Sequence, residues 1–136
     1  MATTQPSLLP DHVLSAVLTL AKKRTNKSRF AFRSHDYSLQ GIFSELSGSY
    51  PILSSFVFSD SGPEPFSPVL NDSVSRLQLS GLIGRENPDY EVVFLSPSAE
   101  AFYDNVLQPR FSAEQVRQLE EIAVKFLQHV KVVEAP

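Results

Sequence analysis

The sequence has 136 residues, of which 42% are hydrophobic and 20% charged, and its formal net charge is −3. A chain of this length forms one domain and buries about two-thirds of its unfolded surface, so it needs no disulfide or metal to fold. Because it contains no cysteine, a disulfide scaffold, a cysteine nucleophile and thiolate-bound zinc or iron–sulfur clusters are excluded.

The N-terminal region lacks the pattern of a secretory signal. The first apolar run, residues 13–21, follows Asp11 and precedes Lys22, Lys23 and Arg24, whereas a signal peptide has its basic residues first. No segment approaches the roughly 20 apolar residues of a membrane helix. We therefore expect a cytoplasmic protein without a membrane partner, with a flexible tail at residues 1–9.

The first half of the chain predicts two helices and a short strand. Apolar residues at helical spacing predict a helix over residues 10–24, and partial alternation predicts a strand over 29–33. Asp36 is a candidate cap for a helix over 37–46. Residues 49–66 are long for a loop, and the pattern there fits a short helix or a strand equally well.

The second half begins with the clearest helix start. Ser67 is a candidate N-cap before Pro68, and the helix is expected to reach Ser80. Residues 82–85 and 90–95 are expected to form an antiparallel hairpin that turns near Asn87 and Pro88. Two further helices are expected, from Ser96 and Pro97 to Leu107, and from Ser112 to Val132 with a capping box.

This element order resembles the winged helix-turn-helix superfamily. Residues 70–96, with Leu70, Leu77, Gly81-Leu82-Ile83 and a strand from Tyr90 to Leu95, resemble the third helix and wing of PadR-like and MarR-like regulators. Gly62-Pro63 and Phe66-Ser67 resemble the Gly-Pro-Phe-Ser signature of uncharacterised winged-helix proteins, some related to antitoxin components, with two residues inserted. The resemblance implies a mainly α fold with a small β-hairpin (α+β), comprising a winged-helix domain at 10–96 and a helical extension at 97–136 that packs on it or dimerises.

The candidate DNA-reading surface has mixed charge. The third helix presents Asn71, Arg76 and Gln78, side-chain types that read base edges in the major groove. However, the charge of Asp72 cancels that of Arg76. The expected wing is acidic, because it contains three acidic residues and only one basic residue, Arg85; the acids are Glu86, Asp89 and Glu91. Base readout by this helix and an ordinary solvated surface both remain open.

The basic residues concentrate in one segment. Half of the chain's 12 lysines and arginines lie between residues 22 and 33, with no acidic residue among them. Because phosphate neutralisation dominates DNA affinity, this segment predicts phosphate contacts. The residues expected to make them are Lys22, Lys23, Lys27 and Arg29. The alternatives are an acidic protein partner or a solvated helix end.

The last helix carries a wide apolar stripe that includes Leu119, Phe126, Leu127 and Val130. These residues predict a homodimer interface, because two-fold dimers are the commonest oligomers. Alternatively, the helix closes over the first helix. The three histidines lack metal-ligand spacing, and no nucleophile elbow, P-loop or dinucleotide-binding motif occurs, so we expect no enzyme activity, no cofactor and no metal.

Two functions follow from this pattern. The first is a non-enzymatic winged-helix regulator of transcription that binds double-stranded DNA. The alternative is a winged-helix protein–protein interaction module, antitoxin-like or an adaptor, that does not bind DNA. The acidic wing and the net charge favour the alternative.

Overall fold

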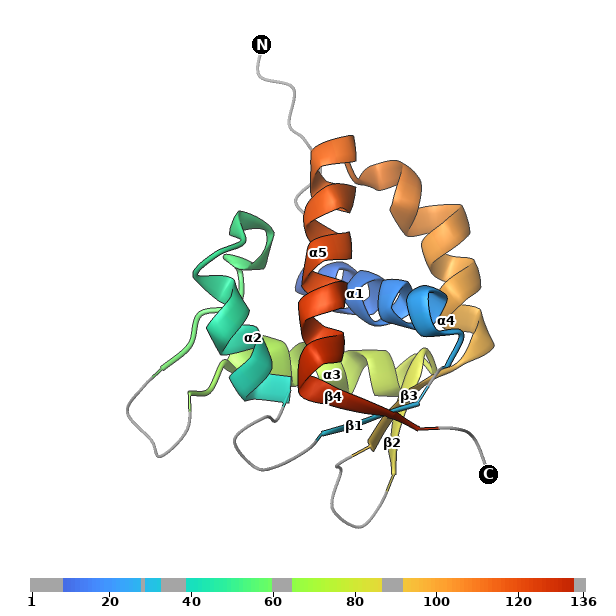
Figure 1. Ribbon diagram of the computed structural model, residues 1–136, viewed down its shortest axis with the longest axis horizontal. Helices are drawn as coiled ribbons and strands as arrows, with labels where there is room; N and C mark the ends of the chain where they lie inside the picture. Colours follow the sequence, from blue (N-terminus) through green and yellow to red (C-terminus); the bar gives the residue numbers. More distant parts are fainter. Residues whose placement is uncertain (1–8, 28, 33–38, 60–64, 87–91, 134–136) are drawn as a thin grey trace.

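The computed structural model describes residues 9–27, 29–32, 39–59, 65–86 and 92–133 (Figure 1). This part of the chain is mostly helical and has one small antiparallel sheet, which confirms the expected α+β class. The main helices are α1 (Pro10–Thr25), α2 (Leu39–Ser47), α3 (Pro68–Leu79), α4 (Pro97–Phe102) and α5 (Ala113–His129). The strands are β1 (Arg29–Phe32), β2 (Ile83–Glu86), β3 (Val92–Leu95) and β4 (Val130–Val133).

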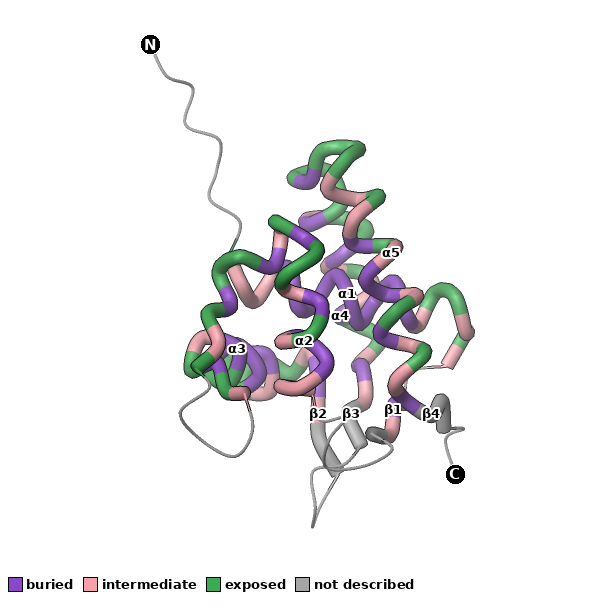
Figure 2. Tube along the Cα trace, turned by 60° about the vertical axis from the view of Figure 1, so that its left-hand side comes forward, coloured by how far each residue is buried: buried purple, intermediate pink, exposed green. Residues whose placement is uncertain are grey.

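Helix α1 forms the centre of the core. Every residue from Val13 to Ala21 is buried, including the polar Ser15 and Thr19. The helix contacts α3, α4 and α5 on its different sides (Figure 1), and the buried residues gather along it and along the inner faces of its neighbours (Figure 2). A helix that is enclosed on all sides places its charged residues at its two ends.

The sheet joins the hairpin to β1, which follows α1, and to β4, which follows α5. Its strand order is β2-β3-β1-β4, and each neighbouring pair is antiparallel. The expected hairpin is confirmed, with Ile83 opposite Leu95 and Gly84 opposite Phe94. Its turn near Asn87 and Pro88 lies outside the described residues. A side chain at Gly84 would collide with the Phe94 ring, so this glycine allows the two strands to pair.

The last element differs from the sequence prediction. Helix α5 ends at His129, and the expected helical end up to Val132 is wrong, because Val130–Val133 is the strand β4. β-Branched residues favour strands, and β1 offers an open edge on the side away from β3. The segment Val130–Val133 therefore pairs with β1 as the edge strand of the same sheet, and Val130 is buried in the core.

The helix starts follow the predicted capping chemistry. The Ser67 hydroxyl accepts a hydrogen bond from the Leu70 amide at 3.2 Å, and α3 ends next to Gly81, whose φ is +79°. Ser112 and Gln115 form the expected capping box at the start of α5. The expected helix over 67–80 is thus confirmed, and the expected cap at Asp36 lies outside the described residues.

Two irregular segments were only partly predicted. The helix expected up to Leu107 divides into α4, a π-helical turn η3 (Tyr103–Leu107) and a 3-10 turn η4 (Gln108–Arg110). The connection after α2 contains a 3-10 turn η2 (Pro51–Leu53) and an isolated bridge between Ser59 and Phe66. In this connection Leu53 and Phe56 are buried, and the Phe56 ring packs edge-on against Phe43 of α2. The described part of this connection before Ser59 is therefore packed against the core.

Candidate binding surface

The exposed side of α3 carries the residues predicted to read bases. Asn71 is exposed and Gln78 is partly buried. Arg76 is also exposed, but its Nε and Nη2 donate hydrogen bonds of 2.7 and 2.8 Å to the two carboxylate oxygens of Asp11 at the start of α1. This bidentate geometry is the strongest arrangement an arginine makes with a carboxylate. The only basic side chain of α3 is therefore already engaged within the chain.

The Asp11–Arg76 pair is charged over the physiological pH range. The guanidinium of Arg76 lowers the pKa of the Asp11 carboxyl below its usual value. Asp11 is the more enclosed partner, with 19% of its side chain exposed against 54% for Arg76. A DNA base that approached Arg76 would have to displace a carboxylate that α1 holds in place.

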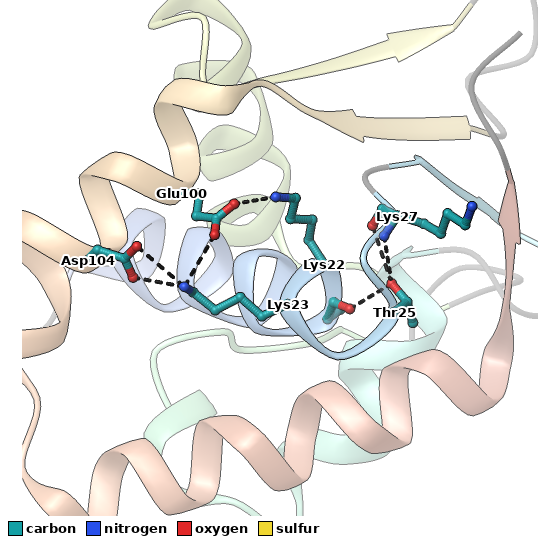
Figure 3. A network of polar contacts seen from close by, with 7 residues as sticks. Lys22, Lys23, Thr25, Lys27, Glu100 and Asp104 are labelled. Carbon is teal, nitrogen blue, oxygen red and sulfur yellow. Dashed lines mark hydrogen bonds and ion pairs between the residues drawn. The ribbon is translucent and has the colours of Figure 1, made fainter.

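The lysines at the other end of α1 are also paired. Lys22 donates a hydrogen bond to Oε1 of Glu100, and Lys23 Nζ lies 3.3 Å from Oε2 of the same residue (Figure 3). Lys23 Nζ also lies 3.0 Å from Oδ1 of Asp104. The Asp104 carboxylate raises the pKa of Lys23, and Lys22 and Lys23 lower the pKa of Glu100, so the Lys23 ammonium and the Glu100 carboxylate are charged at neutral pH.

The remaining two predicted phosphate contacts follow the end of α1. Asn26 adopts a left-handed conformation with φ of 55° and ends the helix. The Thr25 hydroxyl then accepts a 3.2 Å hydrogen bond from the Lys27 amide and donates to the Ala21 carbonyl (Figure 3). Arg29 is the first residue of β1, opposite Phe94 and Val133. The neighbouring Arg33 lies outside the described residues.

The two predicted sets of DNA contacts are separated. Arg76 is fixed at Asp11, in the first turn of α1, whereas Lys22 and Lys23 lie in its last turn. Asp11 and Lys22 are eleven positions apart on the helix, which corresponds to roughly 16 Å along the axis. Carboxylates thus pair with Arg76 at one end and with Lys22 and Lys23 at the other, and these paired cations do not form one continuous basic surface.

A groove lies beside the pair formed by Lys22 and Glu100. It has a volume of about 410 Å³. Lys22, Glu100 and Asp104 supply its charged lining, and Leu95, Pro97 and Ala101 supply its apolar walls. Sequence reasoning missed both acids. Their spacing of four residues was the available signal, because it places two side chains on one face of a helix.

The residues predicted as a dimer interface lie mostly in the interior. Leu119 and Phe126 are fully buried and Val130 is 2% exposed, whereas Leu127 is partly buried. Helix α5 packs on α1, and the Phe126 ring stands edge-on to Phe30 of β1 at 5.7 Å between centroids. The predicted interface is therefore corrected: three of its four side chains already fill the chain's own core, and the stripe closes over α1.

The described residues offer few other sites. They contain no group of three or more histidine, aspartate or glutamate side chains placed to hold a metal ion. Within the same ranges, no helix has the length and apolar character that crossing a membrane requires. Comparison with family models, with curated proteins and with solved structures found no match to the chain.

Proposed function

We propose that the chain is a non-enzymatic binding module on a winged-helix-type scaffold and that its partner is another protein. The order α1, β1, α2, α3, β2, β3 supports this scaffold, as does the pairing of β1 with the hairpin strand β3. A scaffold does not specify a function, so the proposal rests on the surface that the scaffold presents.

The observation that carries the proposal is the bidentate pair between Arg76 and Asp11. DNA-reading helices obtain their affinity from cations that meet phosphates and base edges. Helix α3 has a single basic residue, and a carboxylate of the same chain holds it. The side of α3 around it presents Asn71, Asp72 and Ser75, a surface without positive charge.

Exposed apolar side chains support a protein partner for this surface. Phe66, directly before the N-cap of α3, is 44% exposed, and Leu79, the last residue of the helix, is 87% exposed. Val57 is 70% exposed. It lies two residues before Ser59, which forms a β-bridge with Phe66. Phe66 and Leu79 lie at opposite ends of α3, and exposed apolar and aromatic side chains of this kind suit a protein partner better than a phosphate backbone.

Regulation of transcription through DNA binding is the second candidate. It is favoured by the winged-helix-like element order and by the density of basic residues after Ala21. The two candidates predict opposite behaviour towards a random-sequence duplex at about 50 mM salt, where non-specific affinity is strong. The protein-interaction module shows no salt-dependent binding there, whereas a regulator binds with a steep salt slope.

A position-specific crosslinking experiment tests the protein partner. A photo-reactive phenylalanine derivative in place of Ser75 should crosslink one protein in the native host, whereas the same group in place of the exposed Glu120 of α5 should not. With the purified partner, Leu79→Asp should weaken binding about tenfold or more, as at a buried interface residue. Equal crosslinking from both positions, or steep duplex binding by the unmodified chain, would overturn the proposal.

A further inference from the structure

The end of α1 has the composition of a phosphate-binding segment. Residues 22–27 carry four positive charges and no acidic residue, with Lys22, Lys23 and Arg24 in the last turn of the helix. A cluster of this charge density attracts polyanions such as nucleic acid, so a nearby binding surface selects less well between its own partner and nucleic acid. A protein-binding module with such a segment needs some means to avoid nucleic acid.

Two carboxylates from a distant part of the chain lie over this segment. Glu100 contacts both Lys22 and Lys23, and Asp104 contacts Lys23 at 3.0 Å. Figure 3 shows Lys23 pointing between the two acids. They come from one face of the continuous helical stretch formed by α4 and η3, where residues four apart are neighbours.

Buried side chains anchor the helical stretch that carries the two carboxylates. Ala99 and Tyr103, which directly precede Glu100 and Asp104, are 0% and 3% exposed. These buried side chains fix the α4–η3 stretch in the core. The side chains of Glu100 and Asp104 are 31% and 47% exposed, so solvent and a ligand can still reach them.

The groove at this site is where an approaching phosphate would meet both signs of charge. Its lining includes the Lys22 ammonium together with the Glu100 and Asp104 carboxylates. A phosphate that entered to bind Lys22 would approach two like charges and would have to displace Glu100. Repulsion between the phosphate and the two carboxylates disfavours binding, and this repulsion is strongest at low salt.

We propose that Glu100 and Asp104 are specificity residues that exclude nucleic acid from the basic end of α1. They replace phosphate as the partners of Lys22 and Lys23 and thereby reserve the chain for its protein partner. This role concerns a surface distinct from the exposed side of α3, so it is testable without knowledge of that partner. Removal of the two charges should convert this end of the molecule into a non-specific duplex-binding surface.

The test compares two double variants with equal net charge. Glu100→Gln with Asp104→Asn removes the acids from the lysines, and Glu114→Gln with Glu121→Gln removes two acids from Arg117 on α5. Anisotropy of a labelled random-sequence duplex is followed from about 50 to 200 mM salt. The first variant should bind on the order of tenfold tighter than the control at about 50 mM salt, with a log–log salt slope steeper by about two.

Two further variants assign the gained binding to the lysines. Lys22→Ala with Lys23→Ala, added to the first double variant, should return the affinity and the slope to those of the control. Glu100→Gln alone should steepen the slope by about one, since Asp104 remains beside Lys23. Thermal melting by circular dichroism verifies that each variant is folded.

Equal duplex affinity of the two double variants would overturn the proposal. Duplex affinity that stays high when Lys22→Ala and Lys23→Ala are added to the first double variant would also overturn it. Strong duplex binding by the unmodified chain contradicts the proposed function instead, and the comparison between the two double variants still decides the role of Glu100 and Asp104.

Discussion

Helix α1 is held in two different ways, by apolar packing along its length and by ion pairs at its two ends. The side chains that α5 buries in the core around α1 are all apolar: Leu119, Ile122, Ala123 and Phe126. At the ends, Asp11 pairs with Arg76 of α3, and Lys22 and Lys23 pair with acids of α4 and η3.

The two kinds of contact differ in what they contribute. Each fully buried large apolar side chain stabilises the fold by about 1.5–3 kcal/mol, whereas an exposed ion pair contributes about 0–1 kcal/mol. The packing therefore holds the fold together. The ion pairs contribute little to stability, and their main consequence is the charge pattern that a ligand meets at each end of α1.

Phe126→Ala should have the largest effect on stability. Phe126 is fully buried against Phe30, and loss of its ring leaves a cavity in the core, so we expect a destabilisation of about 3–5 kcal/mol. Urea denaturation monitored by circular dichroism measures the change, and Leu79→Ala at an exposed position is the control with little effect. The unfolding midpoint should not vary with protein concentration; a midpoint that rises with concentration would show that the folded chain self-associates.

Thr19→Val should change stability in the opposite direction and by less. The Thr19 hydroxyl is fully buried and has no hydrogen-bond partner among the described residues, which costs free energy. Replacement by the isosteric valine should stabilise the fold by about 1 kcal/mol. Thr25→Val on the same helix is the matched control and should destabilise it, because the Thr25 hydroxyl bonds to the Ala21 carbonyl and the Lys27 amide.

The sequence predicted the elements whose signals are local. Ser67 and Pro68 predicted the start of α3, because an N-cap residue and a first-turn proline act within one helical turn. The hairpin of β2 and β3 was predicted for the same reason. The end of α5 was missed because Val130–Val133 becomes a strand only through its pairing with β1, a contact between residues about a hundred positions apart.

The binding surface was harder to predict than the fold. Sequence reasoning identified Arg76, Lys22 and Lys23 as exposed cations but could not pair them with Asp11, Glu100 and Asp104, which lie 65 to 81 residues away along the chain. It also could not decide whether the α5 stripe forms an interface or closes over α1, since an apolar face looks the same whether it covers α1 or a second copy. The ion-pair partner of a charged residue and the surface that covers an apolar helix face both depend on tertiary contacts, which the sequence pattern does not contain.

Asp11→Asn should give the smallest effect, and its signature is a dependence on pH. The Asp11 pKa is lowered in the fold by Arg76, so the unfolded chain binds a proton more readily than the folded one. The carboxylate therefore contributes stability above the unfolded pKa of about 3.9, and this contribution is lost as the pH falls through the lower folded pKa. Asp11→Asn should destabilise the chain at neutral pH, and its difference from the unmodified chain should shrink below about pH 4.

The Arg76→Gln background isolates this pair. With the guanidinium gone, the main cause of the lowered Asp11 pKa is removed, and Asp11→Asn should lose most of its pH-dependent effect. High salt should also reduce the effect in the unmodified background, because more than half of the Arg76 side chain is exposed and the pair is screened. An Asp11→Asn difference that stays constant with pH and salt would mean that the pair holds α3 to α1 through hydrogen bonds alone, without a contribution from its charges.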